Sequence, residues 1–184
     1  MKAAGSVEVQ VAGLTIDPFT NMPIVVLRDL AGKRQLPIWI GLVEASSIAT
    51  QLEKVELARP MTHDLMKTLL ETTGAKLEKV EVSELKDDTF YANLHLVIGG
   101  KPVVIDSRPS DAIALALRTG AKIYVAASVL EQSRRVEEQT EAKPRPEQMD
   151  KANELATELA NAPPSKWAEL LEKMSPEHFG KFKM

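Results

Sequence analysis

The chain has 184 residues, of which 44% are hydrophobic and 27% charged, with a formal net charge of −3 and no cysteine. This composition is typical of one globular domain with an appendage. The absence of cysteine excludes disulfides, thiolate metal sites and a cysteine nucleophile. The negative net charge excludes a protein that coats duplex nucleic acid through an excess of Lys and Arg. No apolar run approaches the roughly 18 residues of a membrane span, and no signal-peptide core follows Met1, so we expect no membrane and a cytoplasmic location.

The N-terminal part of the chain predicts three strands. Residues 7–16 begin with strict alternation of apolar and polar side chains, which is the period of a half-buried strand. Residues 23–27 are β-rich, and an Ala-Gly-Lys turn leads from them into a third strand over 34–40. Because Pro37 cannot donate a ladder hydrogen bond, we expect that third strand at an edge of the sheet or at a bulge.

Two helices are predicted next. The first spans 42–55, with three-and-four spacing of its apolar face, formed by Ala45, Ile48, Ala49, Leu52 and Val55. The second starts after Pro60 and ends before Gly74. Its apolar residues are Leu65, Met66, Leu69 and Leu70.

Strands at about 76–85, 89–98 and 101–106 follow, the first two joined by an Asp-Asp turn. Pro109 opens a helix that ends at Gly120, with Arg118 in its last turn, where a cation suits the helix dipole. A short strand over 122–126 and a brief helical turn from Ser128 complete the series. This order predicts a compact, mixed α/β domain over 1–130, with a largely antiparallel sheet and three to four helices.

The C-terminal part differs in composition. Residues 131–148 are charged, contain proline and lack periodicity, as expected of a linker. Residues 149–184 predict short helices that are too small to bury a core of their own. We expect these helices to pack on the main domain, on each other across a homo-oligomer, or on a partner protein.

Two helix starts, at 59–64 and 108–111, repeat one pattern. Each contains Arg-Pro, a hydroxyl residue and a carboxylate in or near the first turn. The simplest interpretation is structural: the hydroxyls of Thr62 and Ser110 cap the helices, and the carboxylates offset the positive N-termini.

Capping does not require the two arginines. An arginine beside an exposed helix N-terminus makes a good anion site, so Arg59 and Arg108 are candidate phosphate ligands. The alternative is a salt bridge between helices.

Four carboxylates are candidate ligands for a divalent cation. Glu44, Asp64, Asp106 and Asp111 could hold Mg²⁺ or Mn²⁺ if the fold brings them together, and such an ion can activate water. Scattered salt bridges are the alternative. His63 and Asp64 cannot form a mutual pair, because consecutive helical residues point about 100° apart, but both could border one cleft.

Three motifs in this order resemble the bifunctional nuclease domain family. They are residues 36–41 (Leu-Pro-Ile-Trp-Ile-Gly) with Glu44-Ala45, residues 59–65 (Arg-Pro-Met-Thr-His-Asp-Leu), and residues 106–115 (Asp-Ser-Arg-Pro-Ser-Asp-Ala-Ile-Ala-Leu). The resemblance covers about residues 5–130. It implies a compact α/β fold, assembly into homo-oligomers, and a nuclease activity on both RNA and DNA, as described for plant members. The matching candidate residues of this chain are Glu44, Arg59, His63, Asp64, Asp106, Arg108, Ser110 and Asp111.

These observations lead to two hypotheses. The first is a metal-assisted phosphodiesterase acting on unstructured, single-stranded RNA or DNA, with His63 as general acid or base, since histidine ionises near neutral pH. Its catalytic residues are His63, Asp64, Asp106 and Asp111, its metal ligands Glu44, Asp106 and Asp111, and its substrate-binding residues Arg59, Arg108 and Ser110. The second is a non-catalytic, homo-oligomeric binding or regulatory module, which the near-neutral charge and the 4% aromatic content favour.

Overall fold

The computed structural model describes residues 5–17 and 20–140 of the chain. The chain divides into two units, and the first of them, residues 1–17 and 22–142, contains every helix and strand described here. Of the second unit, 18–21 and 143–184, only Thr20 and Asn21 lie within the described residues.

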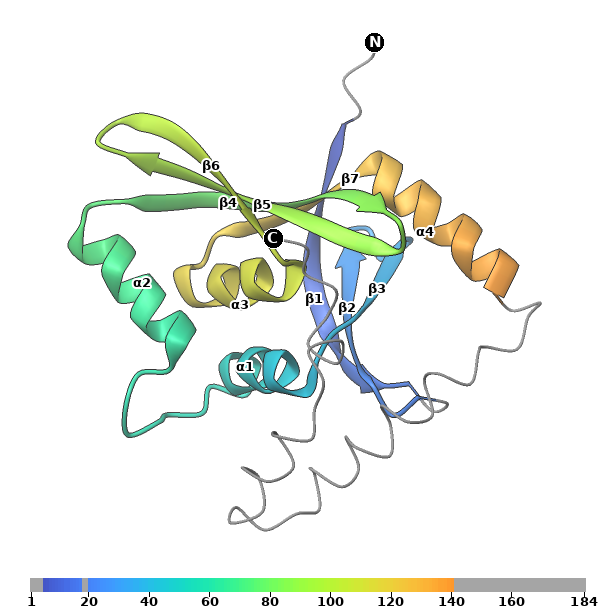
Figure 1. Ribbon diagram of the computed structural model, residues 1–184, viewed down its shortest axis with the longest axis horizontal. Coiled ribbons are helices and arrows are strands. Elements are labelled where there is room, and N and C mark those ends of the chain that lie inside the picture. The colour runs from blue at the N-terminus through green and yellow to red at the C-terminus, as the bar shows by residue number, and fades with distance from the viewer. Residues whose placement is uncertain (1–4, 18–19, 141–184) are drawn as a thin grey trace. The chain divides into compact units, whose positions relative to one another are not determined.

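Three strands, two helices, three strands, one helix, one strand and a last helix follow one another, in the order that the sequence predicts (Figure 1). In chain order they are β1 (Ser6–Ile16), β2 (Pro23–Asp29), β3 (Gln35–Trp39), α1 (Leu42–Leu52), α2 (Thr62–Thr72), β4 (Lys76–Lys86), β5 (Thr89–Ile98), β6 (Lys101–Ser107), α3 (Pro109–Thr119), β7 (Lys122–Ala126) and α4 (Ala127–Thr140).

The seven strands form one mixed sheet in the order β3-β2-β1-β7-β4-β5-β6. All neighbouring pairs are antiparallel except β4 and β7, so the predicted mixed, largely antiparallel sheet is confirmed. β1 pairs with β7 from Ser6 to Val9 and with β2 from Val9 to Ile16, and the register of the β1–β2 pair shifts between Val11 and Gly13. β3 lies at an edge, which confirms the prediction made from Pro37.

Helix α3 is the central helix of the fold. The five consecutive residues 112–116 are each almost completely buried, which is the pattern of a helix enclosed on all sides. α3 packs on β4 and β5 on one side and on both α1 and α2 on another, and Figure 1 shows these three helices gathered together. The N-terminal turn of α3 is thereby fixed against two other helices.

Three sequence predictions about helices need correction. α1 ends at Leu52, before the predicted end at Val55, because Lys54 adopts the left-handed conformation with φ of 52°; Val55 is exposed rather than on the buried face. In α2, Met66 and Leu70 pack on the core, but Leu65 and Leu69 are 54% and 55% exposed.

The third correction concerns α4. The chain does not leave regular structure at residue 131, because α4 continues to Thr140; Val129 and Leu130 in its first turn are buried in the core and anchor the helix there. The rest of the predicted linker, to residue 148, and the predicted helical tail, 149–184, lie outside the described residues. The homo-oligomer and the partner-binding tail stay predictions.

Within the described part of the chain, no helix is both long and apolar enough to cross a membrane.

Candidate functional site

Polar side chains from α1, α2 and α3 meet where the three helices pack together. We call Glu44 and Ser47 of α1, His63 of α2, and Arg108 and Asp111 at the start of α3 the three-helix cluster. Hydrogen bonds join its members into one continuous chain of contacts. One of these bonds, between Arg108 and Glu44, joins residues that are 64 positions apart in sequence.

Arg108 forms one end of this cluster. It is the residue that precedes the first turn of α3, with an extended backbone, and Pro109 starts the helix. Its guanidinium donates from Nε to Asp111 Oδ2 at 2.7 Å, from Nη2 to Asp111 Oδ1 at 3.2 Å, and from Nη1 to Glu44 Oε1 at 2.8 Å. The Arg108 side chain is 47% exposed, so this end of the cluster is open to solvent.

His63 lies between Asp111 and Ser47. Its Nε2 is 3.2 Å from Asp111 Oδ1, its Nδ1 is 2.9 Å from Ser47 Oγ, and its side chain is only 13% exposed. The hydrogen bond from His63, together with that from Arg108, lowers the pKa of Asp111 to about 2. Asp111 is therefore a carboxylate at neutral pH and can only accept hydrogen bonds.

The charge on Asp111 determines the proton positions on His63. Because the carboxylate accepts, the hydrogen-bond network assigns the imidazole proton to Nε2 in the neutral form of His63. Nδ1 is then an acceptor, and the Ser47 hydroxyl donates to it. Ser47, which sequence analysis did not single out, thus lies in the position of a hydroxyl bound to a general base.

Asp64 forms a separate ion pair beside this cluster. Its Oδ1 accepts from Arg118 Nε at 2.6 Å, and its Oδ2 accepts from the backbone N–H of Met61 at 2.9 Å; these hydrogen bonds lower the pKa of Asp64. Arg118 Nη1 also donates to the carbonyl oxygens of Ser47, at 3.1 Å, and Ala114, at 3.0 Å.

Arg118 joins the three helices through these contacts, with a side chain that is only 3% exposed. Sequence analysis interpreted it as a partner of the helix dipole and missed this role. A signal was present, because Arg118 follows Asp111 by seven residues, or two helical turns, and therefore lies on the same face of α3.

The predicted hydroxyl caps are wrong. Met61 and Arg108, not Thr62 and Ser110, precede the first helical residues, and neither α2 nor α3 has a hydroxyl cap. In α2 the Asp64 carboxylate accepts from the Met61 N–H instead. Ser110 is buried in the first turn of α3, which removes its side chain from the surface.

Two other candidates do not join the cluster. In the β5–β6 ladder, Asp106 is opposite Asn93, and its neighbour Ile105 is opposite Leu94. Leu94 is buried, so the Ile105–Leu94 pair lies on the core face of the sheet. Because adjacent strand residues point to opposite faces, Asp106 is directed away from the helices. Arg59 is exposed in the loop between α1 and α2, and no described residue forms an ion pair with it.

The predicted Mg²⁺ or Mn²⁺ ligands are consequently not assembled. Among the residues that the structure describes, no group of three or more His, Asp or Glu side chains could hold a metal ion. Glu44 and Asp111 approach each other only through the guanidinium of Arg108, which already supplies the positive charge between them. These side chains, as placed, do not fit a divalent cation, and a metal requirement stays a prediction.

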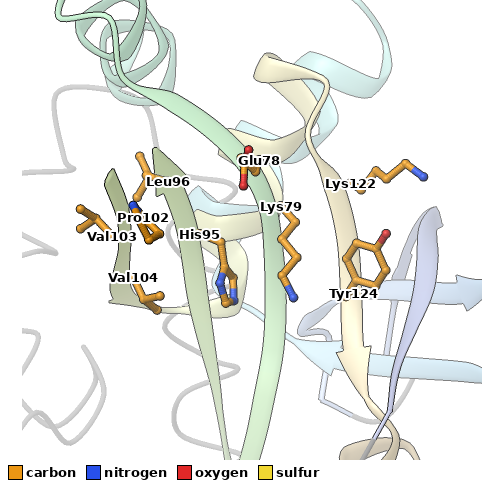
Figure 2. A pocket seen from close by; sticks show the side chains of 9 residues that line it. All are labelled: Glu78, Lys79, His95, Leu96, Pro102, Val103, Val104, Lys122 and Tyr124. Carbon is orange, nitrogen blue, oxygen red and sulfur yellow. The ribbon is translucent and has the colours of Figure 1, made fainter. Parts of the chain in front are cut away.

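A cavity of about 260 Å³ lies on the sheet, apart from the cluster. Figure 2 shows the nine side chains that line it, among them Lys79, His95 and Lys122. Both lysines are already paired, Lys79 with Glu81 at 3.0 Å and Lys122 with Glu8 at 3.0 Å. Arg108 of the three-helix cluster is paired as well, so pairing does not separate the two sites. The cavity lining, however, contains no residue of the three sequence motifs, which makes the three-helix cluster the stronger candidate site.

The depressed pKa of Asp111 predicts a pH dependence of stability. An aspartate with a pKa of about 2 when folded and about 3.9 when unfolded stabilises the fold above about pH 4, and this contribution is lost as the pH falls toward 2. We expect Asp111→Asn to lower the free energy of unfolding at neutral pH by about 2 kcal/mol, and the difference from wild type to shrink between pH 4 and 2. Urea unfolding at several pH values measures it; a difference that is constant with pH would contradict the assignment.

Comparison with known proteins places this site in a family. The family model described as "Bifunctional nuclease domain" matches residues 25–139, which include the whole cluster. An uncharacterised protein of Mycobacterium tuberculosis strain H37Rv is 37% identical over 172 residues, or 94% of this chain and 97% of that protein. Bifunctional nuclease 2 of Arabidopsis thaliana is 30% identical over 93 residues, which cover 49% of this chain and 28% of the plant protein.

Bifunctional nuclease 1 of Oryza sativa subsp. japonica is 29% identical over a match of the same length. The matched region is thus a minor part of each plant protein, whereas the mycobacterial protein aligns along nearly its whole length. The resemblance of the three sequence motifs and the match of the family model agree over the same part of the chain. The chain belongs to the bifunctional nuclease domain family.

Proposed function

We propose that this protein is a nuclease that hydrolyses phosphodiester bonds of RNA and DNA at the three-helix cluster. The observation that carries the proposal is the hydrogen-bonded series Arg108–Asp111–His63–Ser47, which sets a partly exposed guanidinium beside a histidine of assigned tautomer. Membership of the family and the printed names of the plant relatives support the reaction class.

Arg108 is the phosphate ligand in this proposal. Of the five N–H groups of a guanidinium, three donate to Asp111 and Glu44. Two N–H groups remain for the oxygens of a phosphodiester, on a side chain that reaches solvent. Glu44 and Asp111 hold the guanidinium in one orientation, so less conformational entropy is lost when the phosphate binds.

His63 is the residue that transfers protons. Asp111 accepts from Nε2 and orients the imidazole, so that Nδ1 can take a proton and later return it.

One observation favours the alternative of a non-catalytic binding or regulatory module. Arg108 is paired with two carboxylates, and Asp64 and Arg118 are paired with each other, which is the arrangement of a network that fastens helices together. In that function, Arg108 would bind an anion, and the protein would not cleave it.

Cleavage of labelled single-stranded RNA and DNA separates these functions. We expect wild-type protein to cleave, His63→Gln to reduce the rate at least about 100-fold through loss of proton transfer, and His95→Gln on the sheet to cleave at nearly the wild-type rate. Parallel reactions with Mg²⁺, Mn²⁺ or EDTA test the metal requirement, and melting curves confirm that both variants fold. If wild type and His63→Gln show the same trace of cleavage, the nuclease proposal fails and the binding module is favoured.

A further inference from the structure

We propose that Ser47 is the nucleophile of this nuclease, and that cleavage proceeds through a covalent intermediate in which the phosphate is esterified to Ser47. The inference rests on the proposed function and deepens it, because the cluster as a nuclease site leaves open whether water or a protein group attacks the phosphorus.

The geometry that points to Ser47 is its place in a three-residue relay. Ser47 Oγ is 2.9 Å from Nδ1 of His63, and Nε2 of the same ring is 3.2 Å from the Asp111 carboxylate. A hydroxyl bound to a base, which is itself oriented by a carboxylate, is the arrangement that activates a serine nucleophile. The assigned tautomer gives the direction of proton transfer, from the Ser47 hydroxyl to Nδ1.

The backbone of Ser47 is fixed in place. It lies in the middle of α1 and its carbonyl oxygen accepts a hydrogen bond from buried Arg118, which also binds Asp64 of α2. Nucleophile and base are therefore carried by two helices that the same arginine holds together. Rigid elements of this kind keep reacting groups within the narrow limits that catalysis requires.

The phosphate ligand is close to the same base. Arg108 Nη2 and His63 Nε2 both donate to one oxygen, Asp111 Oδ1, each at 3.2 Å. A phosphodiester held by the remaining N–H groups of Arg108 is thus bound on the Nε2 side of the imidazole, and the proposal requires it to extend across the ring so that phosphorus meets Ser47 Oγ on the Nδ1 side. By contrast, neighbouring Ser46 is exposed and points away from this contact, since adjacent helical residues diverge by about 100°.

The reaction balances in two displacements. In the first, Ser47 Oγ bonds to phosphorus, its proton passes to His63 Nδ1, and one P–O ester bond breaks; the departing alkoxide takes the proton from His63 and leaves as an alcohol. In the second, water attacks phosphorus and gives a proton to His63, the bond from phosphorus to Ser47 Oγ breaks, and Ser47 regains the proton. The products are one hydroxyl end and one phosphate end.

The stereochemistry at phosphorus tests this scheme on the wild-type protein. A phosphorothioate diester of a single configuration is cleaved in ¹⁸O-labelled water; two displacements give net retention, and direct attack by water gives inversion. In parallel, we expect Ser47→Ala to lose at least about 1000-fold in rate, with Ser46→Ala close to wild type. A rapidly quenched reaction with ³²P-labelled oligonucleotide should place any protein-bound label on Ser47.

Retention together with the loss in Ser47→Ala supports the inference. Inversion, or a Ser47→Ala variant as active as Ser46→Ala, overturns the role of Ser47 and leaves the proposed nuclease standing. Failure of the wild-type protein to cleave RNA or DNA under any metal condition overturns both.

Discussion

Asp111→Asn is expected to reduce the rate of nucleic-acid cleavage by about 1000-fold while the protein remains folded. The Asp111 carboxylate accepts from both His63 and Arg108, and its charge is what keeps the imidazole proton on Nε2. An asparagine amide can donate as well as accept, so His63 can adopt the other tautomer, with its proton directed at Ser47. In that tautomer the ring cannot take the Ser47 proton.

The matched control is Asp106→Asn. Asp106 is five residues before Asp111 in sequence but is directed away from the helices, so we expect this variant to cleave at nearly the wild-type rate. Initial rates on the same labelled RNA and DNA, with melting curves for each variant, provide the comparison. Equal losses in the two variants would favour the grouping of Asp106 with Asp111 that the sequence predicts, and an unaffected Asp111→Asn variant would remove the three-helix cluster as the site.

The largest loss of stability is expected from Arg118→Met, at about 2–4 kcal/mol in the free energy of unfolding. Methionine keeps much of the apolar stem of the buried side chain but removes the guanidinium. Asp64 then loses its ionic partner, and the carbonyl oxygens of Ser47 and Ala114 lose a donor. Arg118 is 3% exposed whereas Asp64 is 34% exposed, so the cost arises mainly from the charge-assisted hydrogen bonds lost on the buried side of the pair.

Urea unfolding of Arg118→Met beside Lys122→Met measures this effect. Lys122 also has a carboxylate partner, Glu8, but both are solvent-exposed to a substantial degree, and exposed pairs contribute at most about 1 kcal/mol. If the two variants were destabilised equally, Arg118 would not be the residue that fastens α1 and α2 to α3. We expect Arg118→Lys to be destabilised as well, because lysine lacks the planar set of donors. Wild-type stability in Arg118→Lys would show that the positive charge alone is sufficient.

Most of the strands and helices could be predicted from the sequence, because those signals are local, but the course of α4 beyond residue 131 was not predicted. Alternation along 7–16 predicted β1, the Asp87-Asp88 pair predicted the turn between β4 and β5, and Pro37 predicted an edge strand. The motifs also marked the two helix starts that supply His63 and Asp111, and the family to which the chain belongs.

Which of these marked residues meet depends on the way the helices and strands pack together. Asp106 and Asp111 are near in sequence, but the pairing of β6 with β5 turns Asp106 to the far face, and pairing register is set by side chains distant in the chain. Ser47 and His63 contact each other because α1 and α2 both pack on α3. Arg118 is buried for the same reason, since the packing of α1 and α2 on α3 places the Asp64 carboxylate of α2 within its reach.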